Sequence, residues 1–332
     1  MNIVLQNIED KIIQHGYYIS LSQGSLINNL FSRNDFLKYQ SKKQNKNYII
    51  FTLINKQSDE ISIQLVTCYD LKEKGQIFFS PITGAFSDIY MPLKKIDVQV
   101  LTDFLQYIEV YIQIHFSAKK IIYKLPPELY NCEDNNCLLN AFHNRSWEIH
   151  NIDLNFHLEL ISLDEFRRGL NSSTRKRLNK ISRGDVEFNK VNDEANRFLV
   201  YETIRLNRKA QGYPMTMSWD NLNDLYLSLS EAVSFFTLKY NESIVASAIC
   251  LELSPENIYV FYWGENPEFR KLSPIVKLAE QLYSFYLQAG CRTLDIGIST
   301  ENSKPNQGLI DFKKNIGCSL TKKITVEKNL GR

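Results

Sequence analysis

The sequence is poor in residues that break or loosen a fold. Only 13 of its 332 residues are glycine and 9 are proline, which excludes a collagen-like chain and long flexible linkers. Neither sign of charge dominates, because 39 basic residues face 37 acidic ones and the net charge is +2. This balance excludes a protein that coats nucleic acid with its whole surface, so no DNA partner is expected, while a local basic patch stays possible.

Long hydrophobic runs are absent as well. The best candidate for a membrane span, 98–116, is interrupted by four polar residues, Asp103, Gln106, Glu109 and Gln113. It therefore falls short of the roughly 18 unbroken apolar residues that a span needs. The first ten residues include two acids where a secretion signal would have its apolar stretch. We expect a cytoplasmic protein without a transmembrane segment.

Metal-binding and hydrolase signatures are missing. The six cysteines lie mostly in apolar stretches, as reduced core thiols do. Cys132 and Cys137 with His143 suggest zinc, but no second Cys or His pair follows at ligand spacing. The histidines form no paired motif, and neither a Gly-x-Ser-x-Gly sequence nor a Walker loop occurs. No metal is expected, and a serine hydrolase or a Rossmann enzyme would lack its residues here.

The chain does have ample material for packed cores. Hydrophobic residues make up 44% of it and aromatic residues 12%. At roughly 150 residues per domain, its length suggests about two domains.

The order of predicted elements repeats between the two halves. In the first, apolar strands precede an amphipathic helix, a strand, a short helix and a last strand, at 48–55, 61–69, 76–80, 98–115, 120–125, 135–144 and 147–161. The second half has the same order at 233–239, 243–253, 257–263, 275–289, 293–298, 306–316 and 319–326. The sequence therefore predicts two copies of one mixed α/β unit, domains 1–158 and 159–332.

A basic segment lies between the halves. From Arg167 to Arg183 the chain has seven basic residues and no acid. This is either the solvated face of a helix that begins near 171–174 or a surface that meets phosphates. In the second case, a diphosphate-bearing substrate or tRNA would pair with basic side chains, namely Arg175, Lys176, Arg177 and Lys180.

Two further segments could bind an acceptor substrate. Helices are predicted at 193–209 and 219–229, and the loop 207–214 between them carries Tyr213. In the first half, 80–90 follows the third strand. Both segments could equally be ordinary connectors.

A helix start with phosphate-binding features follows the strand at 257–263. Ser273 is at the cap position and Pro274 at the first helical position. A helix N-terminus directly after a strand leaves backbone N–H groups for an anion. Arg270 and Lys271 add positive charge beside it. These residues suggest a phosphate site.

At this point the sequence resembles a known family. The order of elements, the Ser273-Pro274 start, the strand Leu294-Asp295-Ile296-Gly297 and the later Gly308…Phe312-Lys313-Lys314…Gly317 are similar to the GNAT acyltransferase superfamily. More narrowly, they resemble its duplicated Fem-like branch, which includes the peptidoglycan aminoacyl transferases. The resemblance is best over 160–326 and reaches the first half only through the repeat.

The resemblance implies two tandem GNAT-like domains. The first would be structural or help to build the acceptor pocket, with 80–90 facing the acceptor. The second would hold the acyl donor, with a pantetheine arm along β-strand residues and a diphosphate at the helix start, through Tyr259, Phe261, Trp263, Arg270, Lys271 and Ser273. Phe312 and Lys313 match the family's Phe-Lys pair, which lies near the donor's acyl end or its phosphates.

The sequence departs from the family at two places. Leu272-Ser273 replaces the Gly-x-Gly/Ala loop of ordinary GNAT enzymes. This replacement argues against acyl-CoA as the donor. No heptad run corresponds to the coiled-coil arm of some Fem ligases.

Acyl transfer to an amine requires three kinds of group. A base takes the amine proton, donors meet the developing oxyanion, and an acid serves the leaving group. Asp295 and Glu265 are the nearest carboxylates, Tyr262 is a candidate acid, and Lys313 is the candidate for the oxyanion or the phosphates. Structural roles are the alternative to these catalytic ones: Asp295 could be a cap or an ion-pair partner, and Tyr262 and Trp263 could pack in the core.

The leading hypothesis is an N-acyltransferase in cell-envelope polysaccharide metabolism. It would move an acyl group from acyl-CoA to an amine of an amino sugar or amino acid, with a small molecule or nucleotide sugar as acceptor bound near Arg175, Arg177, Lys180 and Tyr213. The first alternative is a Fem-type transferase that uses aminoacyl-tRNA, which the basic segment favours. The second is a catalytically inactive GNAT-fold scaffold or binding protein.

Overall fold

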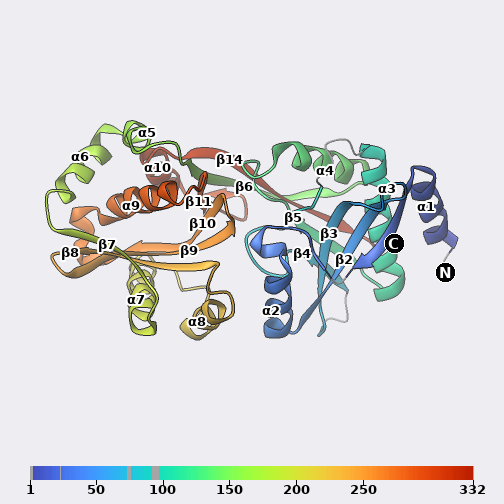
Figure 1. Cartoon of the computed structure of the whole chain (residues 1–332), viewed down its shortest axis with the longest axis horizontal. Coiled ribbons are helices and arrows are strands. Elements are labelled where there is room, and N and C mark those ends of the chain that lie inside the picture. Colours follow the sequence, from blue (N-terminus) through green and yellow to red (C-terminus); the bar gives the residue numbers. More distant parts are fainter. Residues whose placement is uncertain (1–2, 23, 73–75, 92–96, 332) are drawn as a thin grey trace. The chain divides into compact units, whose positions relative to one another are not determined.

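The chain divides into two compact units. The computed structural model describes residues 3–22, 24–72, 76–91 and 97–331. The first unit is Met1–Asp153 together with Thr321–Arg332, and the second is Leu154–Leu320 (Figure 1). The sequence alone predicts a boundary after 158 and leaves the last strand in the second domain. The structure differs on both points, because the end of the chain belongs to the first unit.

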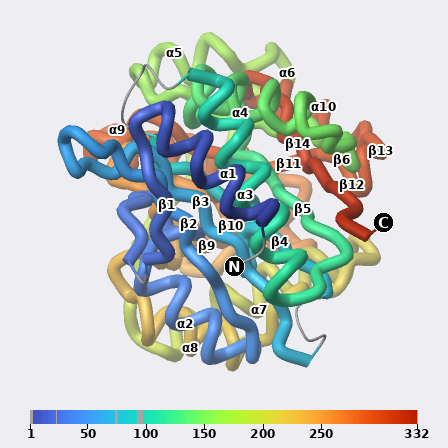
Figure 2. The backbone as a smooth tube through the Cα atoms, turned by 90° about the vertical axis from the view of Figure 1, so that its right-hand side faces the viewer, coloured from blue at the N-terminus to red at the C-terminus, as the bar shows by residue number. Residues whose placement is uncertain are grey.

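The first unit is a mixed sheet with helices on both faces. Its elements are α1 (Ile3–Gln14), β1 (Tyr17–Ser22), η1 (Leu30–Ser32), α2 (Asn34–Gln44), β2 (Lys46–Asn55), β3 (Ile61–Asp70), β4 (Ile77–Ser80), α3 (Val98–Phe116), β5 (Lys120–Lys124), α4 (Cys132–Asn144) and β6 (Glu148–Glu159). The sheet order is β1-β2-β3-β4-β5-β14, and only β4 and β5 run parallel. Helices α1, α3 and α4 lie on one face and α2 on the other (Figure 2).

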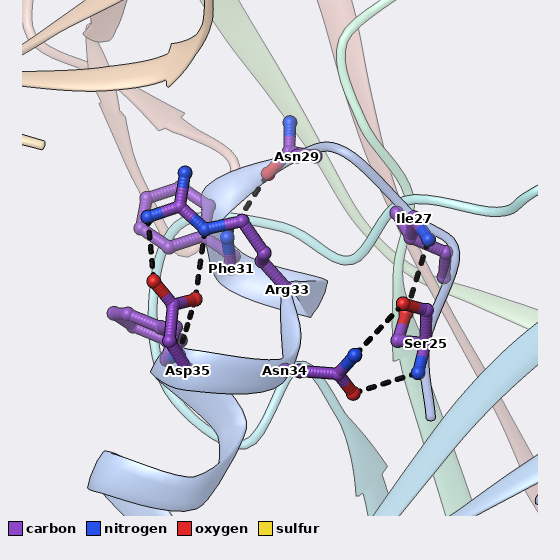
Figure 3. A network of polar contacts seen from close by, with 8 residues as sticks. Ser25, Ile27, Asn29, Phe31, Arg33, Asn34 and Asp35 are labelled. Carbon is purple, nitrogen blue, oxygen red and sulfur yellow. Dashed lines mark hydrogen bonds and ion pairs between the residues drawn. The ribbon is translucent and has the colours of Figure 1, made fainter. Parts of the chain in front are cut away.

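A polar network fixes the segment before α2. The side chain of Asn34 accepts from the Ser25 backbone N–H at 2.7 Å and donates to the Ser25 carbonyl at 3.0 Å (Figure 3). Asn29 caps η1 through the Phe31 N–H. This places the Phe31 ring against Gly84, where an added Cβ would lie 2.5 Å from the ring. The segment thereby holds the loop after β4 in place.

The second unit has the same arrangement. After the end of β6 come α5 (Leu163–Gly169), α6 (Ser172–Ile181), β7 (Val186–Val191), α7 (Glu194–Ala210), α8 (Trp219–Ser228), β8 (Val233–Tyr240), β9 (Ser243–Ser254), β10 (Asn257–Glu265), η2 (Pro267–Leu272), α9 (Pro274–Gln288), β11 (Thr293–Ile298), β12 (Thr300–Glu301), β13 (Lys304–Pro305), α10 (Gln307–Asn315) and β14 (Ser319–Asn329). The sheet order is β6-β11-β10-β9-β8-β7. Helices α7 and α8 cover one face and α9 the other (Figure 1).

The two units exchange their last strands. Strand β6 follows α4 of the first unit, but its residues 155–159 pair antiparallel with β11. Strand β14 follows α10 of the second unit, but its residues 325–329 pair with β5. Each sheet is therefore completed by a strand from the other half of the sequence, which explains why a boundary drawn between the repeats misplaces both strands.

Each unit has its own hydrophobic core. In the first, Phe51, Phe78 and Phe104 are all 0% exposed. In the second, Phe236, Leu278 and Leu294 are equally buried, and the last two come from α9 and β11. Across the described ranges, no helix is both long and apolar enough to cross a bilayer.

Candidate functional site

Strands β10 and β11 separate at the centre of the second unit. They pair in parallel only from Asn257 to Tyr259 on β10 and from Thr293 to Asp295 on β11. Beyond these residues β10 continues to Glu265 and β11 to Ile298, without recorded pairing between them among the described residues. We call these diverging ends the β10–β11 fork. Its unpaired backbone groups can bond an extended, amide-bearing chain as another strand would.

Irregular backbone marks the point of separation on both strands. The pairing of β10 with β9 shifts at Phe261, and that of β11 with β6 shifts at Ile296. Gly297 follows with a φ of +76°, and an added Cβ would lie 3.3 Å from the Tyr259 hydroxyl. Such bulges re-aim side chains and end strand pairing, often beside active sites. The fork is therefore built into the backbone of this unit.

Lys313 reaches the end of β11 from α10. Its side chain is buried, and Nζ donates to the carbonyl oxygens of Gly297 at 2.8 Å and Ile298 at 2.9 Å. Burial lowers the pKa of Lys313 to about 8, against the opposing effects of Cys318 and Asp295. An ammonium has three N–H donors, so two bonds leave one for a developing oxyanion.

The burial of Lys313 predicts a pH-dependent stability. Because its pKa falls from 10.5 to about 8, the unfolded chain binds more protons between these values, and the free energy of unfolding rises with pH there. We expect this rise, on the order of 3 kcal/mol at most, to be lost in Lys313→Met but kept in Lys314→Met. Urea unfolding from pH 7.5 to 10.5 measures it. Equal pH slopes in wild type and Lys313→Met would contradict the lowered pKa of Lys313.

Asp295 lies at the closed end of the fork. It is 0% exposed, and its Oδ1 accepts from the Asn155 side chain at 2.9 Å and from the Gly297 backbone N–H at 2.8 Å. Tyr259 and His157 stand opposite it on the neighbouring strands. Asp295 is therefore part of a buried row of polar side chains and is not an exposed base.

Tyr262 is tied to the loop between α7 and α8. It is 7% exposed and shares a hydrogen bond with the Thr216 hydroxyl. The Arg208 guanidinium lies 5.7 Å from its ring centre. Burial raises the pKa of Tyr262, and the hydrogen bond from Thr216 and the charge of Arg208 oppose this. The exposed Tyr213 lies in the same loop, so the structure brings this predicted acceptor segment to the β10 face of the unit.

A carboxylate of the same chain lies beside the N-terminus of α9. Glu265, 13% exposed at its side chain, accepts from Arg270 Nε at 3.2 Å; burial raises its pKa, and Arg270 and, to a smaller extent, the Ile275 backbone N–H oppose this. Ser273 N–H bonds the Arg270 carbonyl, Pro274 has no N–H, and Val276 N–H bonds the Ser273 carbonyl. The Ser273 and Val276 N–H groups thus have backbone partners, and a diphosphate at this position would meet the nearby Glu265 carboxylate.

The remaining predicted donor residues divide into two groups. Arg270 and Lys271 are exposed on η2, next to Ser273, which has a left-handed backbone and no side-chain cap bond. Trp263 and Phe312 contact each other edge to face, with ring centres 5.9 Å apart. Phe261, the extra residue of the β10 bulge, packs against Tyr262 at 4.3 Å. The aromatic residues therefore flank the fork, and the cations lie beyond its open end.

Helix α6 presents a basic face. Asn171 caps it, as the sequence predicts, and its exposed residues include Lys176, Arg177 and Lys180. Helix α6 packs against α9 and η2, which puts these cations near Arg270 and Lys271. Arg175 differs, because its guanidinium donates to two carbonyls at the end of α5. A phosphate surface at this position stays a prediction and would consist of α6 and η2 residues, whereas Arg175 bonds the end of α5.

Among its described residues, the first unit has no corresponding fork. Its parallel pair β4–β5 is bonded along the whole of β4, from Ile77 to Ser80. Helix α3 is capped by its own Asp97. Within the predicted acceptor segment 80–90, Ser80, Phe86 and Ser87 are buried, and the two serines bond each other at 2.6 Å. Acceptor binding by this segment stays a prediction, and its partly exposed residues are the ones that would contact the acceptor.

No metal centre is evident in the described part of the chain. No group of three His, Cys, Asp or Glu side chains there is arranged to hold an ion. Cys132 is exposed and Cys137 half-buried on α4.

Residues 166–314 match the family model of the acetyltransferase (GNAT) domain. No curated protein has a matching sequence. Among solved structures, FemX has a TM-score of 0.68 at 12% identity, covering 100% of this chain and 97% of that one. A tandem GNAT protein from the clavulanic acid biosynthesis pathway has 0.55 at 7% identity, covering 95% and 99%. The C-terminal domain of a putative lysylphosphatidylglycerol synthetase from Agrobacterium fabrum has 0.53 at 10%, covering 99% and 93%.

These matches define an acyltransferase. The second unit contains a GNAT acetyltransferase domain, and the chain has the fold of tandem GNAT proteins. Residues 166–314 are thus a GNAT domain, and the fold of the chain is similar to that of FemX. The resemblance read from the sequence and the expected pair of GNAT-like domains are thereby confirmed.

Sequence reasoning missed two elements of the site. Glu265 was expected as a carboxylate near the reaction, whereas it pairs with Arg270 beside the N-terminus of α9. Asn155 and His157 had no motif to mark them. They reach Asp295 only because β6 pairs with β11, and that pairing cannot be inferred from spacing along the chain.

Proposed function

We propose that this chain transfers an aminoacyl group from aminoacyl-tRNA to an amine of an amino sugar or amino acid used in the cell envelope. The acceptor is a small molecule or a nucleotide sugar. Such a donor places the reaction in the cytoplasm. Of the two donors expected from the sequence, aminoacyl-tRNA fits the geometry better than acyl-CoA.

The observation that carries this choice is the carboxylate of Glu265 on the N-terminus of α9. Acyl-CoA has a diphosphate, and a helix N-terminus after the central strand is where this fold offers N–H donors to it. Here the Glu265 carboxylate lies near the Ile275 N–H, and the Ser273 and Val276 N–H groups bond backbone carbonyls. A second anion beside this carboxylate would be repelled, so the residues present do not fit the diphosphate of CoA.

The basic face of α6 with η2 supports the same donor. Its cations are exposed and follow one helix face, which suits the spaced phosphates of an RNA better than a single diphosphate. One fold neighbour is named as a putative lysylphosphatidylglycerol synthetase, and that product name joins a lysyl group to a lipid.

The chemistry follows from the fork. The amine attacks the ester carbonyl carbon, and the developing oxyanion takes the free N–H of Lys313, whose other donors hold the end of β11. Phe312 and Trp263 offer an apolar surface beside the fork for the aminoacyl side chain. Tyr262, bonded to Thr216, orients the α7–α8 loop toward the acceptor.

Replacing Glu265 tests the donor choice. We expect wild type to bind CoA and acetyl-CoA only weakly in thermal-shift titrations, and Glu265→Ala to gain CoA affinity by about tenfold or more, because the repelling charge beside the helix N-terminus is gone. Glu268→Ala, an exposed acid on η2, is the control and should gain nothing. Radiolabelled aminoacyl-tRNA should bind and acylate amine acceptors in both proteins.

The second candidate is the acyl-CoA N-acyltransferase. The match of 166–314 to an acetyltransferase domain favours it. Tight CoA binding by wild type, weakened by Arg270→Ala, would establish it and refute the aminoacyl-tRNA proposal. A protein that binds and transfers nothing would point to the inactive scaffold.

A further inference from the structure

A row of three polar side chains crosses the sheet at the closed end of the fork. Tyr259 on β10 is paired with Asp295 on β11, and Asp295 is paired with His157 on β6. Directly opposed residues of neighbouring strands have their Cβ atoms about 5 Å apart and share a face. The three side chains therefore form one continuous row.

The row faces away from α9. Leu158, Val260 and Leu294, which follow or precede the three residues in sequence, all pack in the core cluster that contains α9. Because successive side chains of a strand alternate between faces, the row lies on the face that α7 and α8 cover (Figure 1). This is also the face of Tyr262 and the α7–α8 loop.

His157 has a ring nitrogen without a partner. The residue is 5% exposed, and within the described chain its Nδ1 is buried with no hydrogen bond. Its Nε2 lies 4.0 Å from Glu159 Oε1, so the neutral tautomer with the proton on Nε2 leaves the lone pair of Nδ1 free. Buried polar atoms in a purely structural role are nearly always bonded. A free lone pair beside a buried carboxylate is a place for a proton.

Burial favours the neutral form of His157, and two nearby carboxylates oppose this effect. Burial lowers its pKa below the usual 6.5, while Asp295 on β11 and Glu159 on its own strand oppose the shift. Asp295 in turn interacts with Tyr259 on β10, Lys313 on α10 and Cys318. Protonated His157 would thus face a carboxylate on each side.

We propose that His157 is a positioning residue that, through Asp295, holds the proton of the acceptor amine until the leaving oxygen takes it. The inference rests on the proposed function. In the step, the amine nitrogen bonds to the ester carbonyl carbon and the carbon–oxygen bond breaks, with its electron pair going to the oxygen. One proton moves from nitrogen to that oxygen, and the Asp295–His157 pair carries it between the two.

The pH profile of transfer is the first test. The wild-type rate should fall on the acid side with an apparent pKa below 6.5, because protonated His157 cannot accept. In His157→Asn, which keeps a polar group near Nδ1, we expect a loss of about 100-fold at pH 7 and no such acid limb, with donor affinity unchanged. His143→Asn, on the exposed end of α4, is the matched control.

A second test leaves the row intact. Glu159 is 63% exposed at its side chain, so Glu159→Gln should fold normally, and removing its charge should lower the pKa of His157 measured by NMR. The acid limb of the rate should move to lower pH by the same amount. Asp295→Asn should lower the NMR value further.

The outcomes separate the relay from the proposed function. Transfer that survives His157→Asn with its acid limb in place overturns the relay alone. The relay is also overturned if, in Glu159→Gln, the pKa of His157 measured by NMR moves while the acid limb of the transfer rate stays at the same pH. A protein that transfers no acyl group from any donor overturns the proposed function, and the relay with it.

Discussion

Replacing Lys313 with methionine is expected to lower acyl transfer by about 10²- to 10³-fold while the protein stays folded. The loss comes from the N–H that meets the oxyanion, since removal of one such donor costs about this much. Folding should change little, because methionine fills a similar volume without the burial cost of the ammonium, which offsets the two lost bonds to Gly297 and Ile298. Single-turnover transfer and thermal unfolding measure the two effects.

Lys314→Met is the matched control for this experiment. Lys314 is the next residue of α10 and is exposed, so the change removes the same charge without touching the fork. Its transfer rate should be that of wild type. If Lys313→Met transferred at the wild-type rate as well, Lys313 would have a structural role only, and its proposed contact with the oxyanion would be refuted.

Reversing two charges on α6 is expected to weaken tRNA binding by about 10- to 100-fold near 0.15 M salt. If Arg177 and Lys180 each meet a phosphate, Arg177→Glu/Lys180→Glu should also reduce the steepness of the salt dependence by about two, since each contact releases about one counterion. Filter binding at several salt concentrations measures both quantities.

The control has an equal change in charge on another helix. Lys38→Glu/Lys42→Glu alters two exposed residues of α2 in the first unit and should leave the salt slope unchanged if that helix meets no RNA. Parallel slopes for wild type and both double variants would show that α6 is merely a solvated face.

The repeated architecture could be predicted because its elements have strong periodicity. The apolar stripe of 98–115 and the Ser273-Pro274 start correspond to α3 and α9 within a residue or two. Strand β7 was missed because Val186–Val191 alternates with charged residues and is only partly buried. Helix α2 was missed for a related reason, since Lys38, Lys42 and Lys43 leave it a narrow apolar face.

The site was predicted in part. Lys313 was singled out because Phe312 and the apolar side of α10 direct it inward, and the structure places its Nζ on β11. The polar row was beyond reach, because its members come from three strands whose neighbours are set by the exchange of β6. The role of Glu265 also depends on tertiary geometry, since it lies ten residues from Ile275 and meets it only through η2.

The exchange of last strands has a consequence for the order in which the protein matures on the ribosome. Gln113 bonds the carbonyl of Leu330, 217 residues further along the chain. The sheet of the first unit therefore lacks one strand until residues 325–329 have been synthesised, although its other strands emerge first. In the meantime the edge of β5 is unpaired, which leaves the first unit exposed to mispairing for longer than its early position in the sequence would suggest.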